Sequence, residues 1–348
     1  MNKLISIHDP IRSRLGVVAQ GARSTVSLFA ATAWLTFAAT PAALADDTSG
    51  EAKDMKGVAA PVVEKQTLGS NITGLLNFDV SDKYYTPRGL ESSKNGISMQ
   101  PLLILFFDVY HPDQGPLTDL SFNIGVWNDV DTGTNGTPAA FGGKPGNWDE
   151  IDGFAGVEAK LYKDWKLDAE ETFFRSQTDS YATSTNFDFK TTYLDHWFGD
   201  SGFSINPFGE IFVETSRKAT VAFDVSKDKR GFYGSFGFDP TYKFTTIPLT
   251  LELTTFANFV SEDFYQKSNG APGGVGLAVI STEIKATTPL KFIPISYGAW
   301  SAYAGVQYYH LDNPGLEDGN QLLGNNLGDA SKRDTNLYQF HFGITCFF

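Results

Sequence analysis

The chain has 348 residues, of which 41% are hydrophobic and 14% aromatic, and its formal charge at neutral pH is −13. This acidic balance, without any block of basic residues, argues against a nucleic-acid partner, because phosphate binding requires clustered lysine and arginine. The single cysteine, Cys346, excludes an intramolecular disulfide and a thiolate metal cluster, and we expect it to be a small apolar surface residue. Abundant glycine (34) and phenylalanine (29) favour strands and turns over helices.

The N-terminal part of the chain has the features of an export signal. An uncharged apolar stretch leads to Ala43-Leu44-Ala45, the small-x-small pattern that signal peptidase accepts, so cleavage would leave Asp46 first. An uncleaved anchor is the alternative, but the apolar part is shorter than the ~20 residues that a spanning helix needs. We therefore predict a cleaved signal peptide over residues 1–45 and a periplasmic linker over residues 46–70.

From residue 71 onward, apolar and polar residues alternate, which is the pattern of strands with two different faces. The last segment, 336–348, shows it most clearly, with Gln339, His341 and Thr345 on its polar face. An aromatic C-terminal residue preceded by alternating aromatic residues resembles the signal that outer-membrane barrels present to the barrel-assembly machinery. The residues of this signal are Tyr338, Phe340, Phe342, Ile344 and Phe348.

Other segments carry charges on one of the two faces. In residues 277–286, Ala278 and Ile284 are expected on an apolar face, opposite Glu283 and Lys285. Burying such a charged face in the dry core of a soluble sandwich is costly, whereas the water-filled lumen of a barrel tolerates it. The pattern therefore predicts an all-β chain that forms a transmembrane antiparallel β-barrel in the bacterial outer membrane, over residues 71–348.

Twelve segments fit this pattern, with ten or fourteen strands as alternatives because residues 195–205 and 216–230 are ambiguous. The predicted strands are 71–82, 98–110, 118–129, 149–161, 165–175, 186–194, 206–215, 231–243, 246–258, 274–286, 295–309 and 336–348. An even number of strands with both ends in the periplasm is the rule for single-chain bacterial barrels.

This topology sorts the connections between strands. The outer loops are 83–97, 130–148, 176–185, 216–230, 259–273 and 310–335, and they are longer on average than the inner turns. Short inner turns are predicted at Tyr162-Lys163-Asp164 and at residues 244–245. Aromatic belts are expected at both membrane edges, with Trp165, Trp197, Trp300 and Phe348 inside and Tyr84, Tyr85, Trp127, Tyr308 and Tyr309 outside.

Several short motifs resemble the TorF-like (Gcw_chp) family of outer-membrane porins. Tyr85, Arg88 and Gly89 match the aromatic-x-x-Arg-Gly element that follows the first strand in the family. Trp127 stands in a Gly-x-Trp strand, and Asp152 in an acidic-apolar-Asp strand start. The match covers about residues 70–175, and Pro87 replaces the aromatic residue that is usual in the family. The resemblance implies a small barrel and supplies no substrate.

The predicted lumen face collects most of the polar side chains. Its carboxylates are Asp79, Asp108, Glu150, Asp152, Glu158, Asp168, Glu170, Asp188, Glu210, Glu214, Asp239, Glu252 and Glu283, and its lysines are Lys160, Lys166, Lys190, Lys243 and Lys285. An excess of acids on a pore wall favours cations. We therefore predict a porin-like channel for passive diffusion of small solutes, with Gln339 and His341 also facing the lumen. The alternative is a non-conducting structural or partner-binding barrel whose lumen is filled by ion pairs, because lumen width grows with strand number.

The sequence predicts no enzyme and no cofactor. His310 is the histidine expected near the outer rim, beside Asp312, but no serine motif accompanies it. An acidic, glycine-rich stretch that begins at Asp129 and Asp131 and continues through Gly146 is compatible with calcium, although such loops are more often simply solvated. The expected partners are outer-membrane lipid, the assembly machinery and small solutes, and the expected state is a monomer.

Overall fold

The structure, a computed structural model, describes residues 72–93, 96–112, 115–135, 146–179, 181–216, 229–323 and 334–348. The predicted signal peptide (1–45) and linker (46–70) lie outside these residues. Among the helices of the described part of the chain, none has the length and apolar character needed to cross a membrane.

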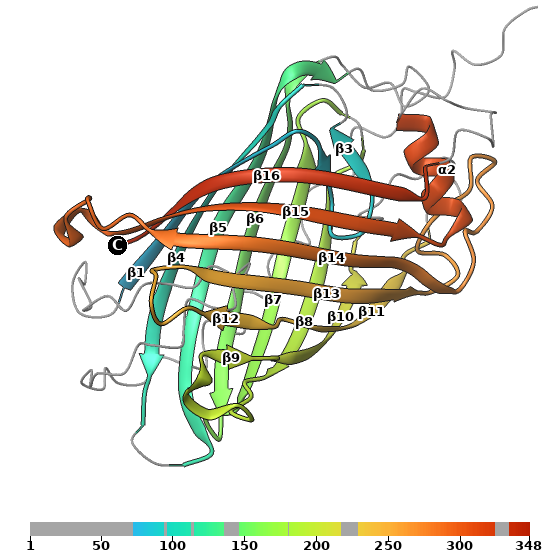
Figure 1. The fold of residues 1–348 in the computed structure, drawn as a ribbon. Helices are drawn as coiled ribbons and strands as arrows, with labels where there is room; N and C mark the ends of the chain where they lie inside the picture. Colours follow the sequence, from blue (N-terminus) through green and yellow to red (C-terminus); the bar gives the residue numbers. More distant parts are fainter. Residues whose placement is uncertain are drawn as a thin grey trace, which may run out of the picture. The chain divides into compact units, whose positions relative to one another are not determined.

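Twelve antiparallel strands close into one barrel (Figure 1). They are β1 (Ile72–Ser81), β4 (Ser98–Tyr110), β5 (Leu117–Asn135), β6 (Gly146–Leu161), β7 (Trp165–Ser176), β8 (Ser184–Tyr193), β10 (Pro207–Glu214), β11 (Phe232–Phe238), β13 (Thr250–Val260), β14 (Gly276–Pro289), β15 (Ala299–Leu311) and β16 (Asn336–Phe347). Each strand pairs with the next one in this order, and β1 pairs with β16, which closes the ring. The predicted twelve-stranded antiparallel barrel is confirmed. Closure leaves no unpaired strand edge, which a wall in contact with lipid requires.

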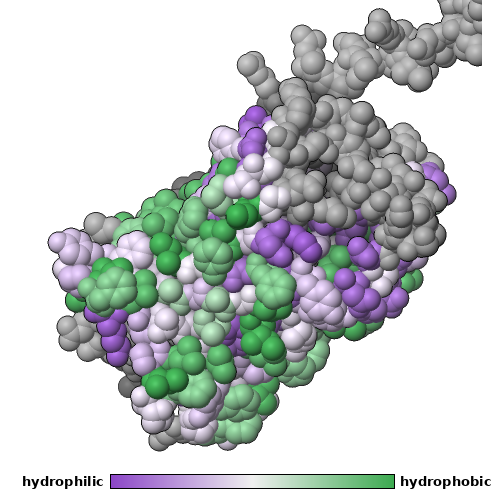
Figure 2. Space-filling view, turned by 45° about the horizontal axis from the view of Figure 1, so that its top comes forward, coloured by the Kyte–Doolittle hydropathy of each residue, from purple (hydrophilic) through white to green (hydrophobic). Residues whose placement is uncertain are grey.

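The alternation of the sequence becomes the two faces of this wall. On β14, Ile284 points outward with 59% of its surface exposed, whereas Lys285 is only 5% exposed inside. Figure 2 shows hydrophobic residues gathered over much of the visible wall. The large apolar side chains of the predicted terminal signal lie on this outer face: Tyr338, Phe340, Phe342 and Ile344. A period of two therefore separates an apolar outer surface from a polar interior.

Glycines on the inner face make room for aromatic rings on the neighbouring strand. Gly125 of β5 pairs directly with Phe154 of β6, and the Phe154 ring occupies the space where a Cβ of residue 125 would be. Gly343 of β16 receives Tyr303 of β15 in the same way. A ring that lies over a glycine stays against the wall, so these pairs hold bulky side chains out of the centre of the lumen.

Three local predictions are wrong. The short turn expected at 244–245 is a longer connection, 244–249, which contains Pro248, a residue that cannot donate to the ladder. Ala278 is fully buried in the interior instead of facing outward, because a register irregularity between β13 and β14 displaces it. Cys346 is 3% exposed, since the segment around Tyr297 and Gly298 covers its thiol.

The predicted inner turn after β6 is present. Tyr162 and Lys163 both adopt positive φ angles, 52° and 67°, and the chain returns at once into β7. On the same side of the barrel, Trp165 packs against Tyr193, which also contacts Trp197. Trp165 and Trp197 are 45% and 60% exposed, as expected for side chains at a membrane edge.

The outer end of the barrel is filled from within. The segment after β1, residues 82–93, contains β2 (Tyr84–Tyr85) and β3 (Glu91–Ser93) and is called here the folded-in segment. It lies at the end opposite the C-terminus, together with α2 (Pro314–Leu323) (Figure 1). Side chains of this segment, of α2 and of seven barrel strands share one hydrophobic cluster. Its buried members are Tyr85, Leu90, Phe174, Phe212, Tyr233, Val260, Phe264, Tyr265, Ala278, Val279, Tyr309, Leu311, Leu316 and Leu337. Burial of these apolar surfaces stabilises the inward path of the segment.

This inward path corrects the prediction of the outer aromatic belt. Tyr85, Trp127 and Tyr309 are 4%, 7% and 1% exposed and belong to interior clusters, and Tyr84 packs on Trp127 with ring centroids 5.2 Å apart. Their positions near the ends of predicted strands had suggested that these residues lie at the membrane edge. Their packing against the folded-in segment draws them into the lumen instead.

Candidate functional site

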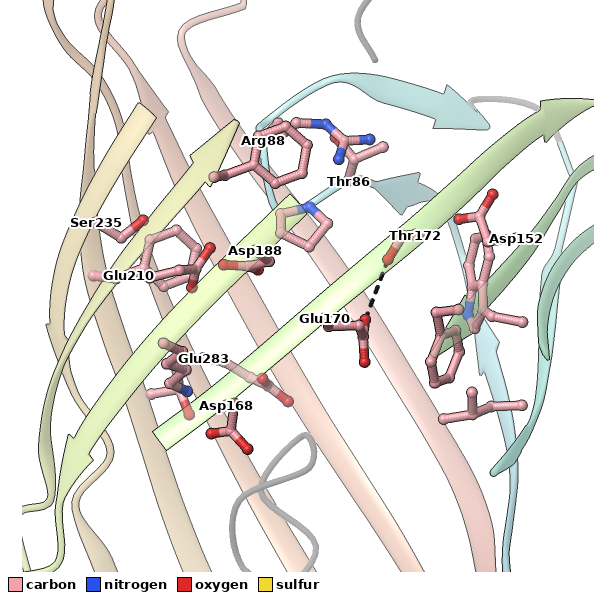
Figure 3. A pocket seen from close by; sticks show the side chains of 18 of the residues that line it. Thr86, Arg88, Asp152, Asp168, Glu170, Thr172, Asp188, Glu210, Ser235 and Glu283 are labelled. Carbon is pink, nitrogen blue, oxygen red and sulfur yellow. Dashed lines mark hydrogen bonds between the residues drawn. The ribbon is translucent and has the colours of Figure 1, made fainter. Parts of the chain in front are cut away.

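A central cavity of about 520 Å³ occupies the lumen beneath the folded-in segment. Figure 3 shows Thr86 and Arg88 at one end of it and Asp168 at the other, with Glu170, Asp188 and Glu210 between them. Most of the predicted lumen residues border this cavity. They are Asp79, Glu150, Asp152, Lys166, Asp168, Glu170, Asp188, Lys190, Glu210, Asp239, Glu283, Lys285, Gln339 and His341.

Six predicted lumen residues do not border the cavity: Asp108, Glu158, Lys160, Glu214, Lys243 and Glu252. Several of them are ion-pair partners at the wall, because Lys160 Nζ lies 3.8 Å from Asp119 and Glu158 lies 3.0 Å from Lys166 Nζ. Glu214 accepts a 2.6 Å hydrogen bond from the main-chain nitrogen of Gly231, near the end of β10. Their absence from the cavity reflects local pairing and position along the strand.

The cations of the lumen are paired along the wall. Lys166 Nζ on β7 lies 3.0 Å from Glu158 on the adjacent β6, and Lys285 Nζ on β14 lies 3.1 Å from Glu252 on the adjacent β13. In both pairs the two strands are neighbours, so these two pairs follow the wall. Lys190 of β8 lies 3.6 Å from Asp239, which follows β11, so this pair passes over the one strand between them, β10.

The same holds for the lumen histidine. His341 on β16 has Nδ1 3.0 Å from Asp79 on β1 and Nε2 3.1 Å from Glu283 on β14. Its ring lies over Gly305 of β15, which pairs directly with it and has no side chain to interfere. The three groups therefore form a polar band across four consecutive strands.

Carboxylates outnumber cations around the cavity. Its border includes nine carboxylates, Asp79, Glu150, Asp152, Asp168, Glu170, Asp188, Glu210, Asp239 and Glu283, against three lysines and one arginine. Because low-dielectric walls focus the field of charges of one sign, an excess of carboxylates raises the local concentration of cations.

Arg88, which was predicted only as part of a family-like motif, projects into this cavity from the folded-in segment (Figure 3). Its guanidinium lies over two aromatic rings, 4.7 Å from the centroid of Phe174 and 5.4 Å from that of Phe212. Tyr85 and Gly89 of the motif hold the main chain around it, while Trp127 and Asp152 of the motif border the cavity or its wall. The motif at residues 85–89 therefore marks a part of the site, but nothing in its sequence indicates that the Arg88 side chain points into the barrel.

The turn that carries Arg88 is fixed on several sides. Within the turn, Gly89 N donates to Thr86 O at 2.7 Å, and the positive φ of Gly89 (79°) permits the reversal. From outside, the hydroxyl of Tyr265 donates to Arg88 O at 2.6 Å, and Asn320 of α2 donates to Gly89 O at 2.8 Å. The segment is thus attached both to the loop after β13 and to α2.

The described residues contain one further cluster of acids. Asp129, Asp131 and Asp149 are buried, and each offers an oxygen within 4.8 Å of the others. Asp129 already accepts a hydrogen bond from Ser98 Oγ. Oxygen clusters suit hard cations such as calcium, but buried acids of this kind assign no ion by themselves. His310, the outer-rim histidine, contacts Asn336 at 3.3 Å.

Comparison of the sequence with protein-family profiles and with curated proteins finds no match. The resemblance to the TorF-like family therefore stays a prediction. Among solved structures, the chain is similar to the COG4313 outer membrane channel from Pseudomonas putida F1, with 11% identity over 80% of this chain and 95% of that one and a TM-score of 0.44. It is also similar to the NanC porin (11% identity, 78% and 98% covered, TM-score 0.39). A third is the outer membrane channel DcaP of Acinetobacter baumannii (9%, 80% and 96%, TM-score 0.37).

A closed antiparallel barrel of twelve strands with an apolar outer face and a charged lumen has the architecture of an outer-membrane β-barrel.

Proposed function

We propose that the chain is a porin-like outer-membrane channel through which small solutes diffuse passively, with a preference for cations. The central cavity carries this proposal, because nine carboxylates border it against three lysines and one arginine. The wall-following ion pairs support it further, since they neutralise lysines without filling the lumen. The proposed channel is a monomer that the assembly machinery inserts through its terminal strand after cleavage of a signal peptide.

Planar-bilayer recordings on refolded protein test the channel. We expect discrete conductance steps, small in size because the folded-in segment and the hydrophobic cluster occupy the outer end of the lumen. A protein that is folded, as judged by heat-modifiable mobility in gels, but gives no steps would contradict the proposal.

The filled outer end favours one second candidate, a non-conducting barrel whose outer surface binds a partner. The hydrophobic cluster joins Leu316 of α2 to Leu90 of the folded-in segment and to seven strands of the wall. Such a core resembles a plug, and a plug that never opens would give no conductance. The same recordings therefore decide between the two functions.

A further inference from the structure

We propose that the Arg88 guanidinium binds the carboxylate of a solute whose ammonium group is bound at the same time by Asp188 and Glu210. The site would make small zwitterions the preferred solutes. This inference rests on the proposed channel function, since it names the solute class that the channel takes.

The guanidinium of Arg88 is a buried charge whose hydrogen bonding is incomplete. Arg88 is 7% exposed. Glu150, which also borders the cavity, attracts the guanidinium, but the Nε of Arg88 has no hydrogen-bond partner. The rings of Phe174 and Phe212 attract the cation, but buried charges are normally paired. A planar guanidinium matches a carboxylate with two parallel hydrogen bonds, so a carboxylate that enters from the cavity would supply the acceptor that Nε lacks.

Arg88 is also held in place before any ligand arrives. Asn258 Nδ2 of β13 donates to Pro87 O at 3.2 Å, and Gln339 Oε1 of β16 accepts from Tyr85 N at 3.2 Å. Together with the bonds from Tyr265 and Asn320, these contacts fix the main chain on both sides of the arginine. A preorganised group loses little freedom on binding, which favours affinity.

Carboxylates stand next to Arg88 along the same wall. Phe212, under the guanidinium, pairs across the strands with Asp188 of β8, and Asp188 pairs in turn with Glu170 of β7. Glu210 lies two residues from Phe212 on β10, which corresponds to about 6.6 Å along a strand, and it accepts a 2.8 Å hydrogen bond from Tyr233. An anion site and a cation site therefore lie within the length of one small molecule (Figure 3).

This arrangement discriminates between solute classes. A simple anion is attracted by Arg88 but repelled by the carboxylates around the cavity. A simple cation is attracted by Asp188 and Glu210 but repelled by Arg88. Only a solute that carries both charges is attracted at both sites. Charge-assisted hydrogen bonds at each end add to its affinity.

Isothermal titration calorimetry on the refolded wild-type protein in detergent tests the site with three probes of one chain length: 4-aminobutyrate, butyrate and butylammonium. We expect 4-aminobutyrate to bind about tenfold more tightly than either of the others, which is the effect of one added charge-assisted contact. Equal affinities for the three probes, or no binding of 4-aminobutyrate, would overturn the proposal.

Variants test which residues bind the carboxylate end and which bind the ammonium end of the zwitterion. Arg88→Gln should weaken 4-aminobutyrate and butyrate by about tenfold and leave butylammonium unchanged or improved, whereas Asp188→Asn with Glu210→Gln should weaken 4-aminobutyrate and butylammonium. Arg175→Gln is the matched control, because Arg175 is an exposed residue on the outer face of β7, beside Phe174. If Arg88→Gln folds and binds 4-aminobutyrate as wild type does, Arg88 only fastens the segment to the wall.

Two further measurements cover the remaining outcomes. If Arg88→Gln does not fold, Arg88→Lys replaces it in the test, because this variant keeps the positive charge. We expect Arg88→Lys to bind butyrate more weakly than wild type, because an ammonium group cannot form the paired hydrogen bonds of a guanidinium. Unchanged butyrate affinity would contradict the proposed site. Calorimetry needs no open pore, so zwitterion binding without conductance refutes the channel and leaves the site, while conductance without binding refutes the site alone.

Discussion

The hydroxyl of Tyr265 donates a 2.6 Å hydrogen bond to the main-chain oxygen of Arg88, although 177 residues separate the two in the chain. Tyr265 belongs to the loop between β13 and β14 and Arg88 to the segment after β1, so the bond attaches the folded-in segment to a distant loop. Burial raises the pKa of the Tyr265 phenol, which therefore stays protonated and remains a donor at physiological pH.

Tyr265→Phe should loosen the folded-in segment. The variant removes the hydroxyl that donates to the buried main-chain oxygen of Arg88. This loss should lower the free energy of unfolding by about 1–3 kcal/mol. We expect a lower free energy of unfolding in urea and noisier single-channel currents, because the segment borders the cavity. Tyr297→Phe, at an exposed tyrosine near the inner end, is the control and should change neither. Identical stability of the two variants would mean that the bond contributes nothing.

Lys285 and Glu252 should behave as a coupled pair. Their side chains are each only 6% exposed and their charged atoms lie 3.1 Å apart. Lys285→Met alone removes the ammonium that lies beside the buried Glu252 carboxylate and should destabilise the barrel by about 3–5 kcal/mol. Adding Glu252→Gln removes that charge and should recover most of the loss. Equilibrium unfolding of both variants measures the coupling, and additive losses would show that the two residues act independently.

Gly125→Val should narrow the lumen. The Phe154 ring lies where a side chain of residue 125 would be, so valine displaces the ring from the wall toward the cavity, which Phe154 borders. Overpacking of this kind costs about 1–3 kcal/mol. We expect reduced single-channel conductance and lower stability. Gly125→Val combined with Phe154→Ala removes the clash and should restore conductance; if it does not, the ring is not the cause.

Ile284→Arg should test which face of β14 meets lipid. Ile284 is 59% exposed on the outer surface, between two inward-facing charged residues. An arginine on the lipid face near the bilayer midplane costs about 2–4 kcal/mol, whereas Ile284→Leu preserves the apolar surface. The comparison is made by unfolding of the two variants in lipid vesicles. Equal stabilities would place this surface in water.

The strands were predictable because each carries its information locally. A period of two in residues 336–348 identifies the strand and also the face that meets lipid. The even number of strands follows because the first and last strands pair antiparallel. The lumen location of His341 followed from the same alternation, since it lies between Phe340 and Phe342 on the opposite face.

The interior of the outer end was not predictable, because long-range contacts determine it. The inward turn at Arg88 depends on Tyr265, Asn258 and Asn320, which are distant in the chain and have no local signature. Ala278 departs from its expected face because of an irregularity in the pairing of two strands. Periodicity within one segment contains no information about either.

The selectivity of the proposed channel is measured most directly by the reversal potential of single channels in a tenfold KCl gradient. The nine carboxylates around the cavity predict a potential of the sign that potassium permeation produces, and a smaller one when Asp188→Asn and Glu210→Gln are combined. A reversal potential of the opposite sign, or one that the double variant leaves unchanged, would contradict an acidic lumen as the determinant of permeation.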